Sequence, residues 1–291
     1  MLAAVASAQQ AGAEERLVQV APAEILRVTT TGSGPPVVLI PSWFASAFAF
    51  RNVVPRLSAA GYRSIVIEPL GYGGSARPEQ ADYSLTAQAD RVATVLGTLA
   101  VERAVVVAHA GAVSIALRLA YRRPERVAAI VAVEGGPTEA AATSGLRRAL
   151  RLAPLLKLFG GMKLVRGRVR GALIDGSANP AWVTDAVLDG YMAPLGKDVD
   201  PVLDALRGMA HAREPERLEP HLPRIRCPVR LVLGGTAHRG GPSEEQVRLL
   251  STRLPSVVVE RVPGAGHHVH EEAPDAVLRA VQATRTGRRL S

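Results

Sequence analysis

The sequence has little cysteine, few aromatic residues and no long apolar run. Cys227 is its one cysteine among 291 residues, which excludes an internal disulfide framework and a cysteine-rich zinc site. Aromatic residues make up only 4% of the chain, so alanine, valine and leucine must fill the core. Ala104–Leu117 is the longest mostly apolar stretch, and it is too short and too polar to span a bilayer. The composition of 47% hydrophobic and 21% charged residues is that of a globular protein and excludes intrinsic disorder.

Lysine is also scarce, although the chain is basic. The net charge is +9, with 35 basic and 26 acidic residues, but the only lysines are Lys157, Lys163 and Lys197. Such an arginine bias can arise from codon composition alone. No basic motif with interleaved aromatic residues is present, so we expect no nucleic-acid partner.

The N-terminus carries one targeting signal. Ala6-Ser7-Ala8 resembles a small-residue signal-peptidase site, but a basic region before it is missing and the apolar stretch is short. We expect residues 1–16 to be a flexible tail or the remnant of a truncated leader. A leader remnant implies export, and a simple tail implies a cytoplasmic protein.

Apolar runs that alternate with helical patterns dominate the rest of the chain. The first runs predict buried strands at Val37–Ile40, Ser64–Ile67, Ala104–Val107 and Ala128–Val133, with helices near residues 48–60, 84–99 and 111–121. Residues 137–218 show only helical segments, and the alternation resumes at Val229–Leu233. This order predicts an α/β fold in which helices flank a mostly parallel sheet. The core comprises residues 17–136 and 219–291, and residues 137–218 form a helical insertion.

The most informative stretch is the predicted strand–turn–helix around residue 110. A nucleophile-elbow motif places small residues two positions before and two after the nucleophile, because larger side chains would clash in so sharp a turn. Ala108 and Ala112 occupy those two positions here, and Gly111 follows the turn. The nucleophile position itself is Ala110, which has no hydroxyl group.

Two further motifs accompany this turn. Glu68–Ser75 reads Glu-Pro-Leu-Gly-Tyr-Gly-Gly-Ser, and Pro263–His267 reads Pro-Gly-Ala-Gly-His. With the elbow, they resemble in content and order the motifs of the α/β-hydrolase superfamily, of the type with a helical cap over the active site. The resemblance covers about Leu17 to Val281. It implies an α/β-hydrolase fold with residues 137–218 as the cap.

The resemblance also implies catalytic roles for three positions. Position 110 matches the nucleophile, and His267 matches the catalytic base. The acid is usually an aspartate after the next-to-last strand, where this chain has Ala237. Some members carry the acid after the strand that follows the elbow helix, where this chain has Glu134. Glu134 is therefore expected to orient His267, and the alternative is a loop acid paired with an arginine.

Backbone N–H groups of Trp43 and Gly111 are expected to form the oxyanion hole. The residues expected to line the substrate pocket are Ser42, Phe44, His109, Trp182 and Tyr191. The resemblance implies no metal and no organic cofactor.

Ala110 leaves three hypotheses open, because nucleophilic catalysis needs an activated oxygen or sulfur. The chain is an inactivated Ser→Ala form of a serine hydrolase, a natural non-catalytic ligand-binding relative, or a His–Glu dyad enzyme such as a lyase or a cofactor-free oxygenase. Retention of Glu134 and His267 favours the first, and the departures at Ser42 and Ala237 favour the others. We therefore predict a serine-hydrolase-type enzyme for a small, largely apolar ester or related acyl substrate. The elbow has no aspartate nucleophile, which disfavours epoxide hydrolase and dehalogenase activity.

A stretch of the predicted cap is strongly basic. Residues 147–170 contain eight arginines and lysines and no acidic residue. This pattern indicates either a solvated face or a surface that attracts an anionic substrate or an anionic membrane.

Overall fold

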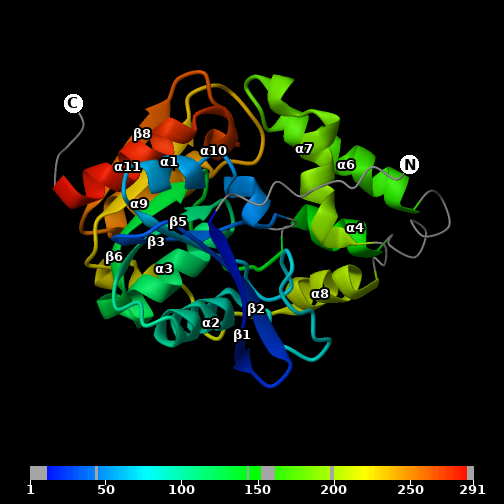
Figure 1. Cartoon of the computed structure of the whole chain (residues 1–291), viewed down its shortest axis with the longest axis horizontal. Coiled ribbons are helices and arrows are strands. Elements are labelled where there is room, and N and C mark those ends of the chain that lie inside the picture. Colours follow the sequence, from blue (N-terminus) through cyan, green and yellow to red (C-terminus); the bar gives the residue numbers. More distant parts are fainter. Residues whose placement is uncertain (1–11, 43–44, 143, 152–160, 197–199, 287–291) are drawn as a thin grey trace.

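The computed structural model describes residues 12–42, 45–142, 144–151, 161–196 and 200–286. These ranges contain one eight-stranded sheet of order β1-β2-β4-β3-β5-β6-β7-β8 (Figure 1). The strands are β1 (Ala13–Ala21), β2 (Glu24–Thr31), β3 (Pro36–Ile40), β4 (Arg63–Ile67), β5 (Ala104–His109), β6 (Val127–Val133), β7 (Val229–Gly234) and β8 (Val257–Val262). The pairs β1–β2 and β2–β4 are antiparallel, and the other neighbours are parallel. The predicted fold class is thus confirmed.

Helices surround this sheet and fill the connection between β6 and β7. The α-helices are α1 (Val54–Ala59), α2 (Leu85–Thr98), α3 (Ala112–Arg122), α4 (Ser144–Arg151), α6 (Gly161–Asp175), α7 (Asp185–Met192), α8 (Asp200–His211), α9 (Glu244–Arg253), α10 (Val269–Glu272) and α11 (Pro274–Thr286). Short 3₁₀ helices are η1 (Ala47–Phe50), η2 (Pro124–Arg126), η3 (Pro180–Trp182), η4 (Ala193–Leu195) and η5 (Glu219–Arg224). No helix in the described ranges is long and apolar enough to cross a membrane.

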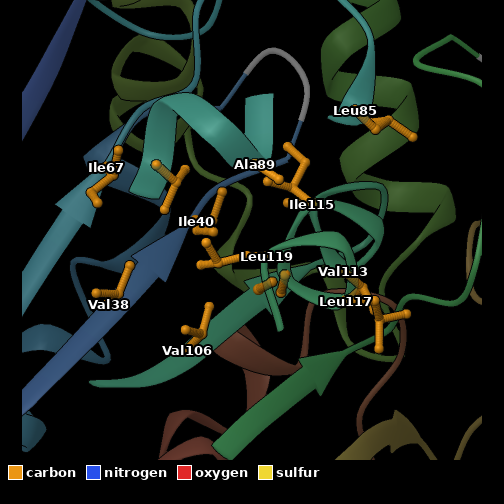
Figure 2. Close-up of a cluster of buried hydrophobic side chains, with 14 of the residues drawn as sticks. Val38, Ile40, Ile67, Leu85, Ala89, Val106, Val113, Ile115, Leu117 and Leu119 are labelled. Atoms are coloured by element: carbon orange, nitrogen blue, oxygen red, sulfur yellow. The ribbon is translucent and has the colours of Figure 1, made fainter. Parts of the chain in front are cut away.

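The sheet is buried on both faces, which explains why its central strands are continuous apolar runs. In β3, Val38 and Ile40 belong to the cluster under α2 and α3, whereas Val37 and Leu39 belong to the cluster under α1 and α11. Figure 2 shows the first cluster, in which Val38 and Ile40 lie with side chains of α3. Alternation along each strand therefore divides the core between two helical layers.

The antiparallel hairpin β1–β2 is absent from the prediction. Most β1 side chains are at least partly exposed, so this strand has no apolar run that would reveal it. The expected tail of residues 1–16 is wrong for Ala13–Arg16, because these residues pair with Val28–Thr31 of β2. Residues 1–11 lie outside the described ranges.

Helices α4, α6, α7 and α8 lie together at one side of the molecule (Figure 1). They come from the stretch between β6 and β7. A third apolar cluster joins Leu173 of α6 and Leu188 of α7 to Ala49 of η1. This cluster connects the helical stretch to the loop that follows β3.

A buried arginine of α3 connects the chain after α8 to the helices α2 and α3 on one face of the sheet. Arg118 of α3 is completely buried, and its guanidinium lies 2.8 Å from Glu139 and 3.1 Å from Glu214. Glu214 also accepts hydrogen bonds from the N–H groups of Leu85 and Thr86 at the start of α2. The chain after α8 is therefore fixed to both α2 and α3.

We expect Arg118→Met to lower the free energy of unfolding by about 3–5 kcal/mol, because it leaves the buried Glu214 carboxylate without a positive counter-charge. Arg207→Met is the control, since it removes an exposed pair with Asp204 and should cost about 0–1 kcal/mol. Urea unfolding followed by circular dichroism measures both. A loss below about 1 kcal/mol for Arg118→Met would show that the buried network contributes little.

Candidate active site

The turn between β5 and α3 is as sharp as the sequence motif predicts. Only Ala110 and Gly111 separate the two elements, and Ala110 has a φ of +50°. This left-handed conformation costs an alanine about 1–2 kcal/mol. The N–H of Ala110 donates to the carbonyl of Val133 at 2.9 Å, and a Cβ atom on Gly135 would lie 2.2 Å from the Ala110 carbonyl oxygen. Close packing against the end of β6 thus holds the turn in place.

Glu134 directly follows β6, and its carboxylate is the centre of a hydrogen-bond cluster. The residue is 1% exposed and has a φ of +49°. Oε1 accepts a hydrogen bond from the N–H of Gly234, and Oε2 lies 2.8 Å from Nε2 of His238 and 3.4 Å from Nδ1 of His267. Burial alone would raise the pKa of Glu134, but the bonds from His267, Gly234 and His238 lower it below its ordinary value. The carboxylate is therefore ionised at neutral pH.

His267 lies on the loop after β8, where the Gly-rich motif predicted it. Its backbone N–H donates to the carbonyl of Gly176 at 2.7 Å, so the loop is fixed to the end of α6. Because Nδ1 faces Glu134, Nε2 is the ring nitrogen left for a ligand. The ring packs against the buried His109, whose Nε2 lies 3.1 Å from the carbonyl of His267. Burial, reinforced by the neighbouring histidines, keeps the pKa of His109 well below its ordinary value.

A cavity of about 640 Å³ brings the expected catalytic positions together. Ala110, Gly111, Glu134 and His267 all line it. Among the expected pocket residues, Ser42, His109 and Tyr191 line it as well. Much of the remaining wall is small or apolar, with Ala45, Ala49, Val169 and Leu173 among its members.

Trp182 does not line this cavity, so that prediction is wrong. Its ring packs against His268 and its Nε1 donates to the hydroxyl of Ser177 at 3.0 Å. The hydroxyl of Tyr191 donates to Glu271 at 2.6 Å. Trp43 and Phe44, expected in the oxyanion hole and the pocket, lie outside the described residues.

Two residues of the site received no role from the sequence. His238 pairs with Glu134, and its position beside Ala237 is the signal that could have revealed it. The carboxylate of Glu68 is 1% exposed and accepts hydrogen bonds from the N–H groups of Ala47 and Gly74. Burial raises the pKa of Glu68, and these two bonds partly offset the effect. Glu68 thereby joins the start of η1 to the turn at Gly74.

Two groups of described side chains could each offer three metal ligands. They are His109, His268 and His270, and Glu134, His238 and His267, with the ligand atoms of each group within 4.8 Å of one another. In the second group, Oε2 of Glu134 is already within hydrogen-bond reach of both imidazoles. We assign no metal to either group.

We expect Ala110→Gly to raise the free energy of unfolding by about 0.5–1 kcal/mol, because glycine relieves the left-handed strain at some entropic cost. Ala116→Gly, which removes the same methyl group from the interior of α3, should instead cost about 1 kcal/mol. Chemical denaturation of both variants measures whether each substitution raises or lowers the free energy of unfolding. Equal destabilisation by both changes would show that the turn is not strained.

Comparison with known proteins identifies the family of this fold. The model of the Alpha/beta hydrolase family matches residues 37–280. The 2-(acetamidomethylene)succinate hydrolase of Mesorhizobium japonicum is 26% identical over 261 residues, which are 88% of this chain and 90% of that protein. Bifunctional epoxide hydrolase 2 of Rattus norvegicus is 32% identical over 117 residues, 40% of this chain, and the match spans only 21% of that protein. The solved structure of the epoxide hydrolase CorEH superposes with a TM-score of 0.75 at 19% identity, covering 95% of this chain and 100% of that one. The chain belongs to the alpha/beta hydrolase family.

Proposed function

We propose that this chain carries the site of a serine-type hydrolase for a small ester or related acyl compound, with alanine in place of the nucleophile. The observation that carries the proposal is the left-handed turn at Ala110, which faces the same cavity as the Glu134–His267 pair. A serine at this turn would place its hydroxyl in the cavity with the free Nε2 of His267. With alanine there, the chain forms no acyl-enzyme intermediate.

The proposed roles of the other residues follow from their contacts. His267 is the general base, and Glu134 fixes its orientation through Nδ1. The N–H of Gly111 is the oxyanion donor within the described residues, because it follows the nucleophile position. The many small and apolar residues of the wall suit an acyl chain better than a charged group.

We further propose that residues 137–218 act as a cap over this cavity. Val169 and Leu173 of α6 and Tyr191 of α7 line it, opposite the ends of the parallel strands. The basic stretch of this cap is partly neutralised, because Arg166 and Arg170 pair with Asp185 and Asp189 of α7. Of the two interpretations of its charge, these pairs favour a solvated face.

One relative that matches along most of its length supports a small acyl substrate, although several others are named epoxide hydrolases. The relative from Mesorhizobium japonicum matches along most of its length, and the substrate in its name carries an acetamido group, which is an acyl group on nitrogen. The epoxide hydrolase of rat matches over a fifth of its length. Position 110 of this chain holds neither an aspartate nor a serine, so the preference for an acyl substrate rests on the relative from Mesorhizobium japonicum and on the wall of the cavity.

We expect Ala110→Ser to hydrolyse p-nitrophenyl esters at least about 100-fold faster than the unchanged chain, since nucleophile and base act as one unit. Adding His267→Ala should return the rate to the level of the unchanged chain. Ala140→Ser is the matched control, because it adds the same hydroxyl to a partly exposed position of the cavity wall outside the turn and should remain inactive. Esters of graded chain length report the size of the acyl pocket.

Other outcomes of the same assay favour the other hypotheses. If Ala110→Ser is folded and inactive on all esters while the unchanged chain binds a ligand tightly, the protein is a binding relative. A reaction of the unchanged chain that disappears with His267→Ala indicates dyad chemistry. The specific observation in favour of dyad chemistry is that Glu134 and His267 remain within hydrogen-bond reach without a neighbouring hydroxyl at position 110.

A further inference from the structure

The imidazole of His238 lies between two hydrogen-bond acceptors. Its Nδ1 is 2.7 Å from the carbonyl oxygen of Thr236, and its Nε2 is 2.8 Å from Oε2 of Glu134. A carbonyl oxygen can only accept, so Nδ1 must carry a proton. A neutral imidazole has a single N–H group, and its Nε2 would then turn a lone pair toward the carboxylate. Two facing lone pairs at 2.8 Å repel unless a proton lies between them.

That proton belongs to the histidine and not to Glu134. The Glu134 carboxylate accepts from the N–H of Gly234 and faces Nδ1 of His267, and all of its neighbours favour the ionised form. An ionised carboxylate is an acceptor only, so His238 must donate through both ring nitrogens. Such a ring is an imidazolium.

We propose that His238 is a permanent imidazolium at neutral pH and that it is a positioning residue for the Glu134–His267 pair. Its charge holds the carboxylate in place and neutralises it, so that His267 remains the neutral base of the site. The second part of this inference rests on the proposed function, whereas the charge of His238 does not.

The loop that carries His238 fits closely over the pair. A Cβ atom on Gly241 would lie 2.5 Å from Oε2 of Glu134 and 3.0 Å from Nε2 of His238. A Cβ atom on Gly240, whose φ is +104°, would lie 3.3 Å from the ring of His267. Glycines at both positions therefore let the backbone approach all three side chains. This close approach excludes bulk water from Oε2 of Glu134, the oxygen that His238 and His267 share.

The charges around His238 agree with this assignment. Burial alone would lower the pKa of His238, but its bonds to the Thr236 carbonyl and Glu134 raise the pKa above its ordinary value, and Glu272 adds a favourable negative charge. The adjacent Arg239 is 3.9 Å from Asp175 of α6. His267 and His268 are two further titratable neighbours: the ring centre of His267 lies 6.2 Å from that of His238, and His238 is one of the groups that lower the pKa of His268, after burial.

The shared oxygen explains how His238 acts on His267. Oε2 is closer to His238 than to His267, so the negative charge of Glu134 is already paired. A second positive charge on His267 would face the first across about 6 Å of partly buried space. His267 therefore keeps its Nδ1 proton toward Glu134 and a free lone pair on Nε2. Without His238, the carboxylate would lose the positive charge that holds Oε2 in place, and the attraction of the Glu134–His267 pair for an additional proton would rise.

Ring ¹⁵N chemical shifts of the unchanged chain test the charge directly, with His238→Gln used to assign the signals. At pH 7.5 an ordinary histidine is about one-tenth protonated, whereas we expect both nitrogens of His238 to be protonated. A neutral His238 with one bare nitrogen would overturn the proposal. So would one equivalent of zinc retained by the purified chain and lost in His238→Gln, because a metal ion would then occupy the place of the proton.

The pH profile of an active variant tests the positioning role. In the Ala110→Ser background, we expect His238→Gln to shift the acidic limb of kcat/KM upward by about one pH unit. His211→Gln, an exposed histidine on α8, should leave the profile unchanged. A drop in kcat at every pH with no shift of the limb would show a merely structural role and overturn the proposal. If Ala110→Ser has no activity, the proposed function fails, and the ¹⁵N measurement still decides the charge of His238.

Discussion

The buried carboxylate of Glu134 is the group on which the rest of the site depends. It follows β6, bonds to the last residue of β7 through the N–H of Gly234, and faces His267 on the loop after β8. Three neighbouring parallel strands are therefore tied to one side chain that is 1% exposed. A buried ionised group is costly unless its partners compensate for the lost water. This need for partners explains why the site is built from the ends of strands, where backbone donors and loop side chains converge.

The sequence predicted those features that local patterns record. The central strands are continuous apolar runs because both faces of the sheet are buried there, and the helix expected near residues 84–99 begins at α2, which Ser84 caps. Ala110 and Glu134 directly follow strands, and His267 ends the Gly-rich motif five residues after β8, so short local patterns and the family resemblance predicted all three. Parallel strands carry their ends to one edge of the sheet, so residues far apart in sequence had to meet in one cavity.

Features that depend on packing between distant segments were not predictable. The mostly exposed strand β1 is held by its pairing with β2, and its own residues give no periodic signal. Trp182 was predicted to line the pocket, yet its ring packs against His268, which is 86 residues away in the sequence, so no local pattern could reveal this contact. Sequence reasoning sought an aspartate near residue 237 and found alanine, and the histidine beside it gains its role only once Glu134 lies within 2.8 Å.

The backbone conformation of the site indicates that the surrounding contacts determine its geometry. Ala110 and Glu134 both adopt a φ near +50°, although neither is glycine. Each such residue costs about 1–2 kcal/mol and persists only where its surroundings determine it. Ala110 is held by the carbonyl of Val133 and by the space that Gly135 leaves, while Glu134 is held by its three donors. Two strained residues and a buried carboxylate thus converge on one cavity, and this convergence supports the proposal that residue 110 occupies the place of a nucleophile and that Glu134 orients His267.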